Sequence, residues 1–192
     1  IQGNAYKTIR IGEQVWFSEN LRTSLYNSGD PIATTSEEIH EMENPHYQWP
    51  SDGNEENIET YGRLYTWHVI TDSRNLCPCS WHVPSMEEWM ELTTYLGDPE
   101  TSGGRLKEEG MKHWLKPNTG ADNSSGFNAL PAGIRDYTSS FAWFGQSATF
   151  WTSTENDEDS GVSFTLSHTN KEVYEDVYSK KAGYSVRCVR DR

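Results

Sequence analysis

Acidic side chains gather in one short run, residues 155–159, and carboxylates can serve either catalysis or cation binding. Glu155 and Asp157 stand two residues apart, and a pair of carboxylates is what glycoside hydrolysis requires. Asp157 and Asp159 are alternatively calcium ligands, because Ca²⁺ is bound by carboxylate and carbonyl oxygens. An exposed acidic loop with neither role explains the same run and is far commoner than a catalytic pair.

Other signatures of catalysis are missing from the sequence. It contains no HExxH zinc motif and no GxSxG nucleophile motif, and its six histidines lie far apart. A second polar run, Asp52 to Asn57, lacks the ligand order of an EF-hand, so it is read as a surface loop with a calcium site as the alternative. We therefore expect a protein that is not an enzyme, with no cofactor unless calcium binds.

Three cysteines, Cys77, Cys79 and Cys188, leave the redox state open. Cys77 and Cys79 are too close to bridge each other comfortably. Either could pair with Cys188 and close a loop of ~110 residues, which would stabilise the fold by several kcal/mol. Three buried thiols are the alternative. The spacing fits no zinc site, because a second cysteine pair and a matching histidine pair are both missing.

Length and charge narrow the class of protein. The chain has 192 residues and a formal net charge of −13, which fits a single domain over 1–192. Such a charge argues against nucleic acid or an anionic membrane as partner. No run approaches the ~20 apolar residues of a membrane span. The first residue is Ile1 and not Met, so either a leader has been removed or the chain has been trimmed.

One stretch has the complete signals of a short amphipathic helix, residues 85–96. Ser85 and Glu88 have the spacing of a capping box, and Gly97 can end the helix. The apolar residues share one face: Met86, Trp89, Leu92 and Leu96. A helix of about three turns is marginal alone in water, so it must dock on a core.

The remaining elements are expected from alternation and turn residues. Residues 6–17 form a hairpin with a Gly12-Glu13 turn. Residues 61–70 form a buried strand or a tight ring-packed segment, in which His68 is a core histidine, with a ligand role as the alternative. A short helix starts at Thr35, with Ile39 and Met42 on one side. A second helix covers 101–109, and 110–150 form a turn-rich lobe. Four more strands are expected at 149–153, 162–167, 172–179 and 184–190.

Six ordered motifs carry a resemblance over nearly the whole chain. They are YKTIRIGEQVWFSENL (6–21), YGRLYTW (61–67), CPCSWHVPSMEEW (77–89), DNSSGFNALPAGIR (122–135), FWTST (150–154) and YSVRCVR (184–190). Together they resemble the Fibrobacter succinogenes major paralogous domain family, which is placed with C-type-lectin-like folds. The WHVPSMEEW and YSVRCVR stretches are also similar to formylglycine-generating-enzyme domains. That activity would need a cysteine pair near the C-terminal third, where only Cys188 lies.

The resemblance implies an α+β, C-type-lectin-like fold. It has antiparallel sheets, two short helices, a long irregular loop lobe, and adjacent N- and C-terminal strands. It also implies a secreted or outer-surface protein of Bacteroidetes-type bacteria, often a lipoprotein anchored through a removed leader. The family's usual Cys-Pro-x-Gly-Trp matches here at Cys77, while Cys79 and Ser80 replace a small residue and the glycine. This implies a Cys77–Cys188 disulfide, with Cys79 as the odd thiol or a competitor.

Lectin-like folds carry ligands on the irregular lobe, so the resemblance implies a binding role. Its candidate ligand-binding residues are Arg135, Asp136, Tyr137, Trp143 and Phe144 in the lobe, with Glu155 and Asp157 beside it. The expected ligand is a glycan or a protein. A surface adhesin or assembly component that binds an envelope or host protein is the alternative, and a glycoside-active enzyme is the third reading. Trp143 and Phe144 could equally form the core of the lobe.

Overall fold

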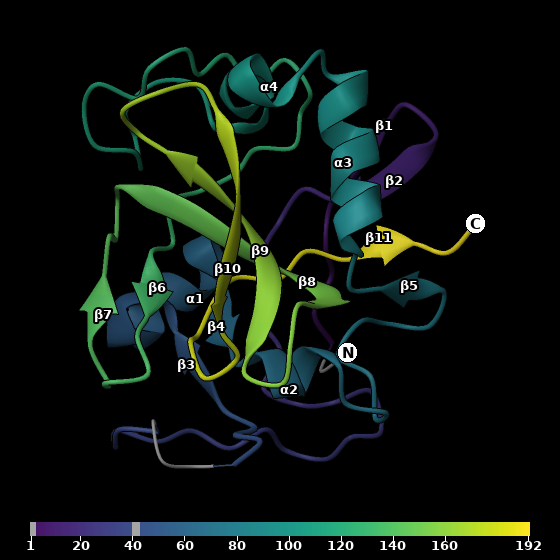
Figure 1. The fold of residues 1–192 in the computed structure, drawn as a ribbon, viewed down its shortest axis with the longest axis vertical. Coiled ribbons are helices and arrows are strands. Elements are labelled where there is room, and N and C mark those ends of the chain that lie inside the picture. Colours follow the sequence, from purple (N-terminus) through teal and green to yellow (C-terminus); the bar gives the residue numbers. More distant parts are fainter. Residues whose placement is uncertain (1–2, 40–42) are drawn as a thin grey trace.

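The N-terminal hairpin and the end of the chain share one sheet in the computed structural model, which describes residues 3–39 and 43–192. The sheet has the order β1-β2-β11-β5 and antiparallel pairing (Figure 1). Trp16 of β2 pairs with both Ile9 and Val189, so the last strand lies beside the N-terminal hairpin, next to its second strand and not next to β1. Gly12 has φ 59° in the two-residue turn, a conformation that favours glycine. The strands are β1 (Thr8–Ile11), β2 (Gln14–Phe17), β5 (Trp81–His82) and β11 (Val189–Arg190).

The longest strands form a second antiparallel sheet with the order β10-β9-β8. These are β8 (Ser147–Glu155), β9 (Ser160–Ser167) and β10 (Val173–Ser179). Three of the expected strands fall within or beside these ranges. Two small hairpin pairs complete the strands: β3 (Gln48–Pro50) with β4 (Arg63–Tyr65), and β6 (Ile134–Arg135) with β7 (Phe141–Ala142). The described chain is therefore mixed α+β with antiparallel sheets.

Most of the helical content lies in two helices, α3 (Met86–Tyr95) and α4 (Pro99–Leu106). At the start of α3, the Ser85 hydroxyl accepts from the Glu88 amide at 3.3 Å, and the Glu88 carboxylate accepts from the Ser85 amide at 2.9 Å. The capping box is therefore present as expected. The shorter helical segments are η1 (Ser51–Gly53), η2 (Glu55–Asn57), α1 (Ile58–Tyr61) and α2 (Trp67–Ile70).

Helix α3 docks through Trp89, which is fully buried. Its ring stacks on Phe164 of β9 at 5.1 Å between centroids, and it contacts Trp16 of β2 edge-on at 5.3 Å. Phe127 and Phe150 lie at 5.6 and 5.4 Å. One indole thus joins residues from both larger sheets, and Figure 1 shows α3 lying between them.

The predicted strand over 61–70 is wrong for most of its length. Only Arg63–Tyr65 is a strand, because Gly62 turns the chain with φ 76° and α2 begins at Trp67. The hydroxyl of Thr66 donates to the carbonyl of Pro45 at 2.6 Å. A partner 21 residues earlier thus holds the residue that separates strand from helix.

The predicted closing strand, 184–190, is also interrupted. Tyr184 bridges to Tyr65, Ser185 bridges to Phe150, and regular pairing resumes only at Val189. The segment crosses from one sheet to the other, so its alternation reflects burial between them and not one continuous ladder.

The two helix predictions outside α3 need adjustment. The second helix spans 99–106, not 101–109, and starts with Pro99 in its first turn. Residues 35–39 are not helical: the Thr35 hydroxyl accepts from the Glu37 amide, and the Thr35 carbonyl accepts from the Trp49 indole at 2.6 Å. The rest of that predicted helix, including Met42, lies outside the described residues.

A disulfide joins Cys77 to Cys188, with the Cα atoms 6.0 Å apart. It connects the segment before β5 to the residue before β11, and both cysteines are buried. Cys79 is an exposed free thiol. The pairing expected from the family resemblance is confirmed. Among residues 3–39 and 43–192, no helix is long and apolar enough to cross a bilayer.

Candidate ligand-binding site

The acidic run at the β8–β9 turn is built around an internal ammonium group. Lys180 is buried, and its Nζ donates to the Glu155 carboxylate at 2.5 Å and to the carbonyls of Asp157 and Glu158 at 2.6 and 2.8 Å. The same nitrogen lies 4.6 Å from the centroid of the Trp67 ring. Of the two calcium candidates, Asp157 thus gives its main-chain carbonyl to a lysine, and Asp159 is not among the acceptors of that ammonium. No cluster of three or more metal-binding side chains occurs within the described ranges.

Asp157, the second predicted carboxylate of this run, is committed to the turn itself. Its oxygens accept from the amides of Asp159 and Ser160 at 2.9 and 2.8 Å, and from the Asn156 side chain at 2.8 Å. Hydrogen bonds, those with Ser160 first, hold the pKa of Asp157 below its usual range. A general acid in glycoside hydrolysis needs a raised pKa, so this environment makes Asp157 a poor proton donor.

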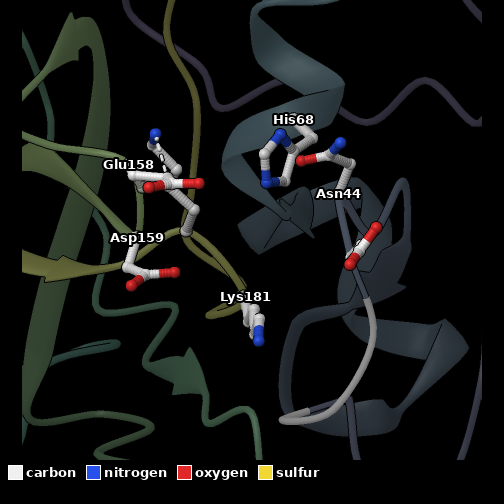
Figure 2. Close-up of a pocket in the computed structure, with 7 residues that line it drawn as sticks. Asn44, His68, Glu158, Asp159 and Lys181 are labelled. Carbon is white, nitrogen blue, oxygen red and sulfur yellow. Dashed lines mark hydrogen bonds between the residues drawn. The ribbon is translucent and has the colours of Figure 1, made fainter.

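A hollow of about 350 Å³ lies beside this turn, and we call it the polar cleft. Figure 2 shows His68 and Asn44 on one side of it, with Glu158 and Asp159 on the other. The remaining lining residues are Glu43, Lys180 and Lys181. Charges of both signs and neutral polar groups therefore face one space.

His68 supplies the neutral group with the most hydrogen-bonding freedom in the polar cleft. Burial, followed by the neighbouring charges of His46 and Lys180, lowers the pKa of His68 to about 4. The imidazole is thus neutral at pH 7, with one nitrogen as donor and one as acceptor. Its ring contacts His46 and Trp67 at 5.8 Å. His68 is a half-buried cleft residue, so the expectation of a core histidine is wrong.

A second hollow of about 480 Å³ has a buried arginine in its wall, and we call it the arginine pocket. Arg135 is 1% exposed. Its guanidinium carbon lies 4.1 Å from the centroid of the Trp49 ring and 6.0 Å from that of Phe141. The complete lining is Thr34, Thr35, Ser36, Trp49, Pro50, Gly53, Glu55, Arg135, Ser139 and Phe141.

The guanidinium of Arg135 is held by main-chain oxygens only. Nη2 donates to the carbonyl of Glu37 at 3.0 Å and Nη1 to that of Asp136 at 3.3 Å. Among the described residues, no carboxylate lies within ion-pair distance of Arg135. Burial lowers the pKa of Arg135, and the nearby charge of Asp136 opposes that effect. Within the described ranges, the pocket therefore presents a buried cation with no carboxylate at ion-pair distance.

The other predicted lobe residues are distributed over the surface. The Asp136 carboxylate accepts from the Thr138 amide at 3.0 Å, and Tyr137 shares a hollow of about 350 Å³ with Asp159. Trp143 is 52% exposed, whereas Phe144 is half-buried and packs on Tyr61 at 4.8 Å. Neither of these two rings lines the polar cleft or the arginine pocket.

Residues 9–190 match the Fibrobacter succinogenes major domain. The chain belongs to that family. The match includes every residue that lines the polar cleft and the arginine pocket. No curated protein and no solved structure matches the chain.

Within this family domain, the residues that sequence reasoning missed at the two hollows include His68, Trp49 and Phe141. Trp49 lies in a stretch that reads as irregular, and its contact with Arg135 joins β3 to β6 across the chain. Phe141 was expected only as part of the lobe's own core. No local pattern marks such residues, because the fold alone brings them to one pocket.

Proposed function

We propose that this domain is an exported, non-enzymatic binding module that recognises glycans through the arginine pocket. The observation that carries the proposal is the composition of that pocket: a half-buried Phe141 ring, hydroxyl side chains, and a guanidinium with donors to spare. Ligand pockets combine apolar walls with a few well-placed polar groups. A sugar ring offers a C–H face for the aromatic ring and several oxygens for the donors.

A C-type-lectin-like architecture is part of the proposal. The adjacent terminal strands and the irregular segment between α4 and β8 support it, because loops held on a rigid scaffold commonly carry binding sites. The Cys77–Cys188 disulfide supports export to the outer cell surface, since disulfides persist in oxidising compartments. Lipid anchoring through a removed leader is carried only by the family resemblance.

We further propose that binding does not require calcium. The ammonium of Lys180 already supplies a positive charge to Glu155 and to the carbonyls of the 155–159 run. Chelation should therefore leave both the melting temperature and ligand binding unchanged. A melting temperature that rises on addition of CaCl₂ and falls with EDTA would contradict this part of the proposal.

A glycan array read with and without EDTA tests the binding function. We expect a restricted set of glycans to bind, and Phe141→Ala to weaken binding without a change in fold. Tyr95→Ala is the matched control, because Tyr95 is an exposed aromatic residue on α3. If no glycan binds at any concentration tested, the proposal is wrong. We also expect no turnover of a panel of aryl glycosides, and turnover that depends on Glu155 would favour the hydrolase reading.

A protein-binding adhesin is the second candidate, and one observation favours it. Trp143 and Leu115 are each 52% exposed, and the Leu115 amide donates to the carbonyl of Gly145 at 2.8 Å. Two large apolar side chains thus stand on neighbouring backbone segments. In pull-downs from the envelope of the source organism, loss of a specific protein with Trp143→Ala, but not with Phe141→Ala, would favour this candidate.

A further inference from the structure

Four basic side chains are buried in the described part of the chain, and in three of them every side-chain nitrogen donates a hydrogen bond: Lys107, Lys180 and Arg187. The Lys107 ammonium donates to three main-chain carbonyls at 2.6 to 3.0 Å. Lys180 also has three acceptors, and an ammonium has three N–H groups. Each of the three nitrogens of Arg187 donates, to the Asn20 side chain and to two carbonyls. This fold therefore satisfies the cations that it buries.

Arg135 is the exception among the four. A guanidinium has five N–H groups, and only two acceptors are present, both main-chain carbonyls. Its Nε makes no hydrogen bond to any described residue. Arg135 lines a pocket of about 480 Å³, so a ligand that enters this pocket would lie beside the guanidinium.

Within the described ranges, neither Asp136 nor Glu55 lies within ion-pair distance of this guanidinium. The carboxylate of Asp136 accepts from the Thr138 amide at 3.0 Å and from the Tyr178 hydroxyl at 3.5 Å. Glu55 is on the pocket wall, but its side chain is 74% exposed and lies 3.4 Å from Arg63. A buried charge without a partner is costly, and an incoming anion would remove that cost.

A carboxylate is the anion that fits this arrangement best. The planar fork of a guanidinium matches a carboxylate with two parallel hydrogen bonds. Three further pocket residues carry hydroxyls that make no side-chain hydrogen bond within the described ranges: Thr34, Ser36 and Ser139. These hydroxyls suit a polyhydroxylated ligand, and the exposed carboxylate of Glu55 disfavours a second negative charge. The volume lies within the range of small-ligand sites, about 300–1,000 Å³.

We infer that the arginine pocket binds a carboxylated sugar residue, such as a uronate, with the ligand carboxylate paired to Arg135. The sugar hydroxyls meet Thr34, Ser36 and Ser139, and the ring packs on Phe141. This inference rests on the proposed glycan-binding function and narrows it to acidic glycans.

The test compares ligands that differ only at the carboxyl group. Titrations of the wild-type protein with α-1,4-digalacturonate and with its dimethyl ester, followed by calorimetry and by the NMR signal of the Trp49 indole N–H, measure the two affinities. We expect the ester to bind at least about tenfold more weakly, because it cannot form the charge-assisted pair. A glucuronate-terminated and a glucose-terminated disaccharide provide a second matched pair.

The outcomes separate this inference from the proposed function. Equal affinity for acid and ester overturns the inference and leaves glycan binding intact. Failure of every glycan, acidic or neutral, overturns both. If an Asp-rich peptide binds at least as tightly as digalacturonate, the pocket recognises a protein carboxylate, and the inference of a carboxylated sugar as ligand is overturned.

Variants locate the binding in the pocket. Arg135→Lys keeps the charge but loses the planar fork, so digalacturonate should bind it more weakly and the difference in affinity between acid and ester should become smaller. Ser139→Ala and Thr34→Val remove hydroxyls that have no hydrogen-bond partner among the described residues, so they should fold normally and weaken digalacturonate binding several-fold. Thr94→Val on α3 is the matched control, since Thr94 is exposed on a helix that does not line the pocket. Unchanged affinity in both hydroxyl variants would exclude the assigned pose. Should Arg135→Lys lower the melting temperature strongly, the acid–ester comparison on the wild type still decides.

Discussion

Removing the disulfide gives the sharpest test of how the two ends of this fold are held together. The perturbation is Cys77→Ala with Cys188→Ala, made in a Cys79→Ser background. That background is needed because Cys79 is exposed and two residues from the bridge, so it could exchange with the bridge. Alanine suits both buried positions.

The expected loss in the free energy of unfolding follows from the length of the loop that the disulfide closes. The cysteines are separated by 111 residues, and the chain-entropy model assigns about 4.7 kcal/mol to a loop of that size. Strand pairing in the native state adds little stability at this end of the chain, because β11 is two residues long and pairs through Val189 with Trp16 and His82. The hydrogen bond from the Phe17 amide to the Cys188 carbonyl, at 2.9 Å, remains in the variant. For a chain of this size, about 4–5 kcal/mol corresponds to a loss of about 10–20 °C in melting temperature.

Thermal unfolding followed by circular dichroism and by calorimetry measures the effect. We expect the same folded spectrum, a melting temperature lower by about 10–20 °C, and no change for Cys79→Ser alone. A loss below about 3 °C would refute the reasoning, because the bridge would then constrain the unfolded chain very little. Mass spectrometry without reduction checks the pairing itself, and three alkylatable thiols would refute it.

Three further predictions concern single side chains. Lys180→Met removes three hydrogen bonds of a buried ammonium, and chemical denaturation should show a loss of about 2–3 kcal/mol after allowing for rehydration of the exposed loop. Ser80→Gly should raise the free energy of unfolding by about 0.5–1 kcal/mol, because the exposed Ser80 has φ 66°. Burial lowers the pKa of His82, but hydrogen bonds to Asp191 and Glu88 outweigh it and raise the pKa. The stability from His82 is therefore fully present below about pH 6.5 and is lost as the pH rises through the folded-state pKa, so His82→Asn should flatten this part of the stability profile.

Each of these three predictions has a control and a contrary result. Lys7→Met, at a surface lysine 3.7 Å from Glu19, should leave stability unchanged, and an equal effect of the two lysine variants would exclude the caged ammonium. For Ser80, Ser80→Ala should give no gain, so a gain from alanine would show that φ is not the cause. For His82, if the free energy of unfolding depends on pH in the same way in wild type and His82→Asn between pH 5 and 9, the imidazole does not cause that dependence.

The parts of the fold that the sequence predicts well are those set by neighbours along the chain. The capping box, the apolar face of α3 and the Gly12 turn all rest on contacts within a few residues. Such signals can be read from spacing, and the structure has them at the expected positions. The family resemblance, and not spacing, supplied the choice of Cys77 over Cys79.

The parts that failed depend on partners far away in sequence. Thr66 is held by Pro45, and the Thr35 carbonyl is taken by the Trp49 indole, so local propensity for strand or helix is overridden. Helix α4 shows the same effect. A Cβ on Gly103 would lie 2.3 Å from the Glu172 carbonyl oxygen, so a glycine that weakens a helix on its own is required by close packing against the start of β10.

The candidate site also has features that the sequence suggests and features that depend on contacts between distant residues. Arg135 could be proposed from its place in a turn-rich lobe, but its burial, its stacking on Trp49 and its lack of a carboxylate partner are properties of the assembled fold. Lys180 gave no signal at all, because a lysine after a strand reads as a surface residue. Because Lys180 is buried, Glu155 and two carbonyls of the acidic run accept hydrogen bonds from a side chain of the same molecule. The sequence instead suggested calcium binding or catalysis for this run.

Buried cations explain how an acidic chain with so much irregular backbone keeps its loops in place. Main-chain carbonyls in loops lack the partners that helices and sheets provide. Here Lys107 binds the loop carbonyls of Thr119 and Asn170 and the carbonyl at the end of β9, and Arg187 fixes those of Phe127 and Asn128. A buried cation in this fold therefore acts first as a clamp on backbone. Among the buried cations of the described residues, Arg135 clamps only two carbonyls and lines the arginine pocket, and this combination is what favours a ligand there.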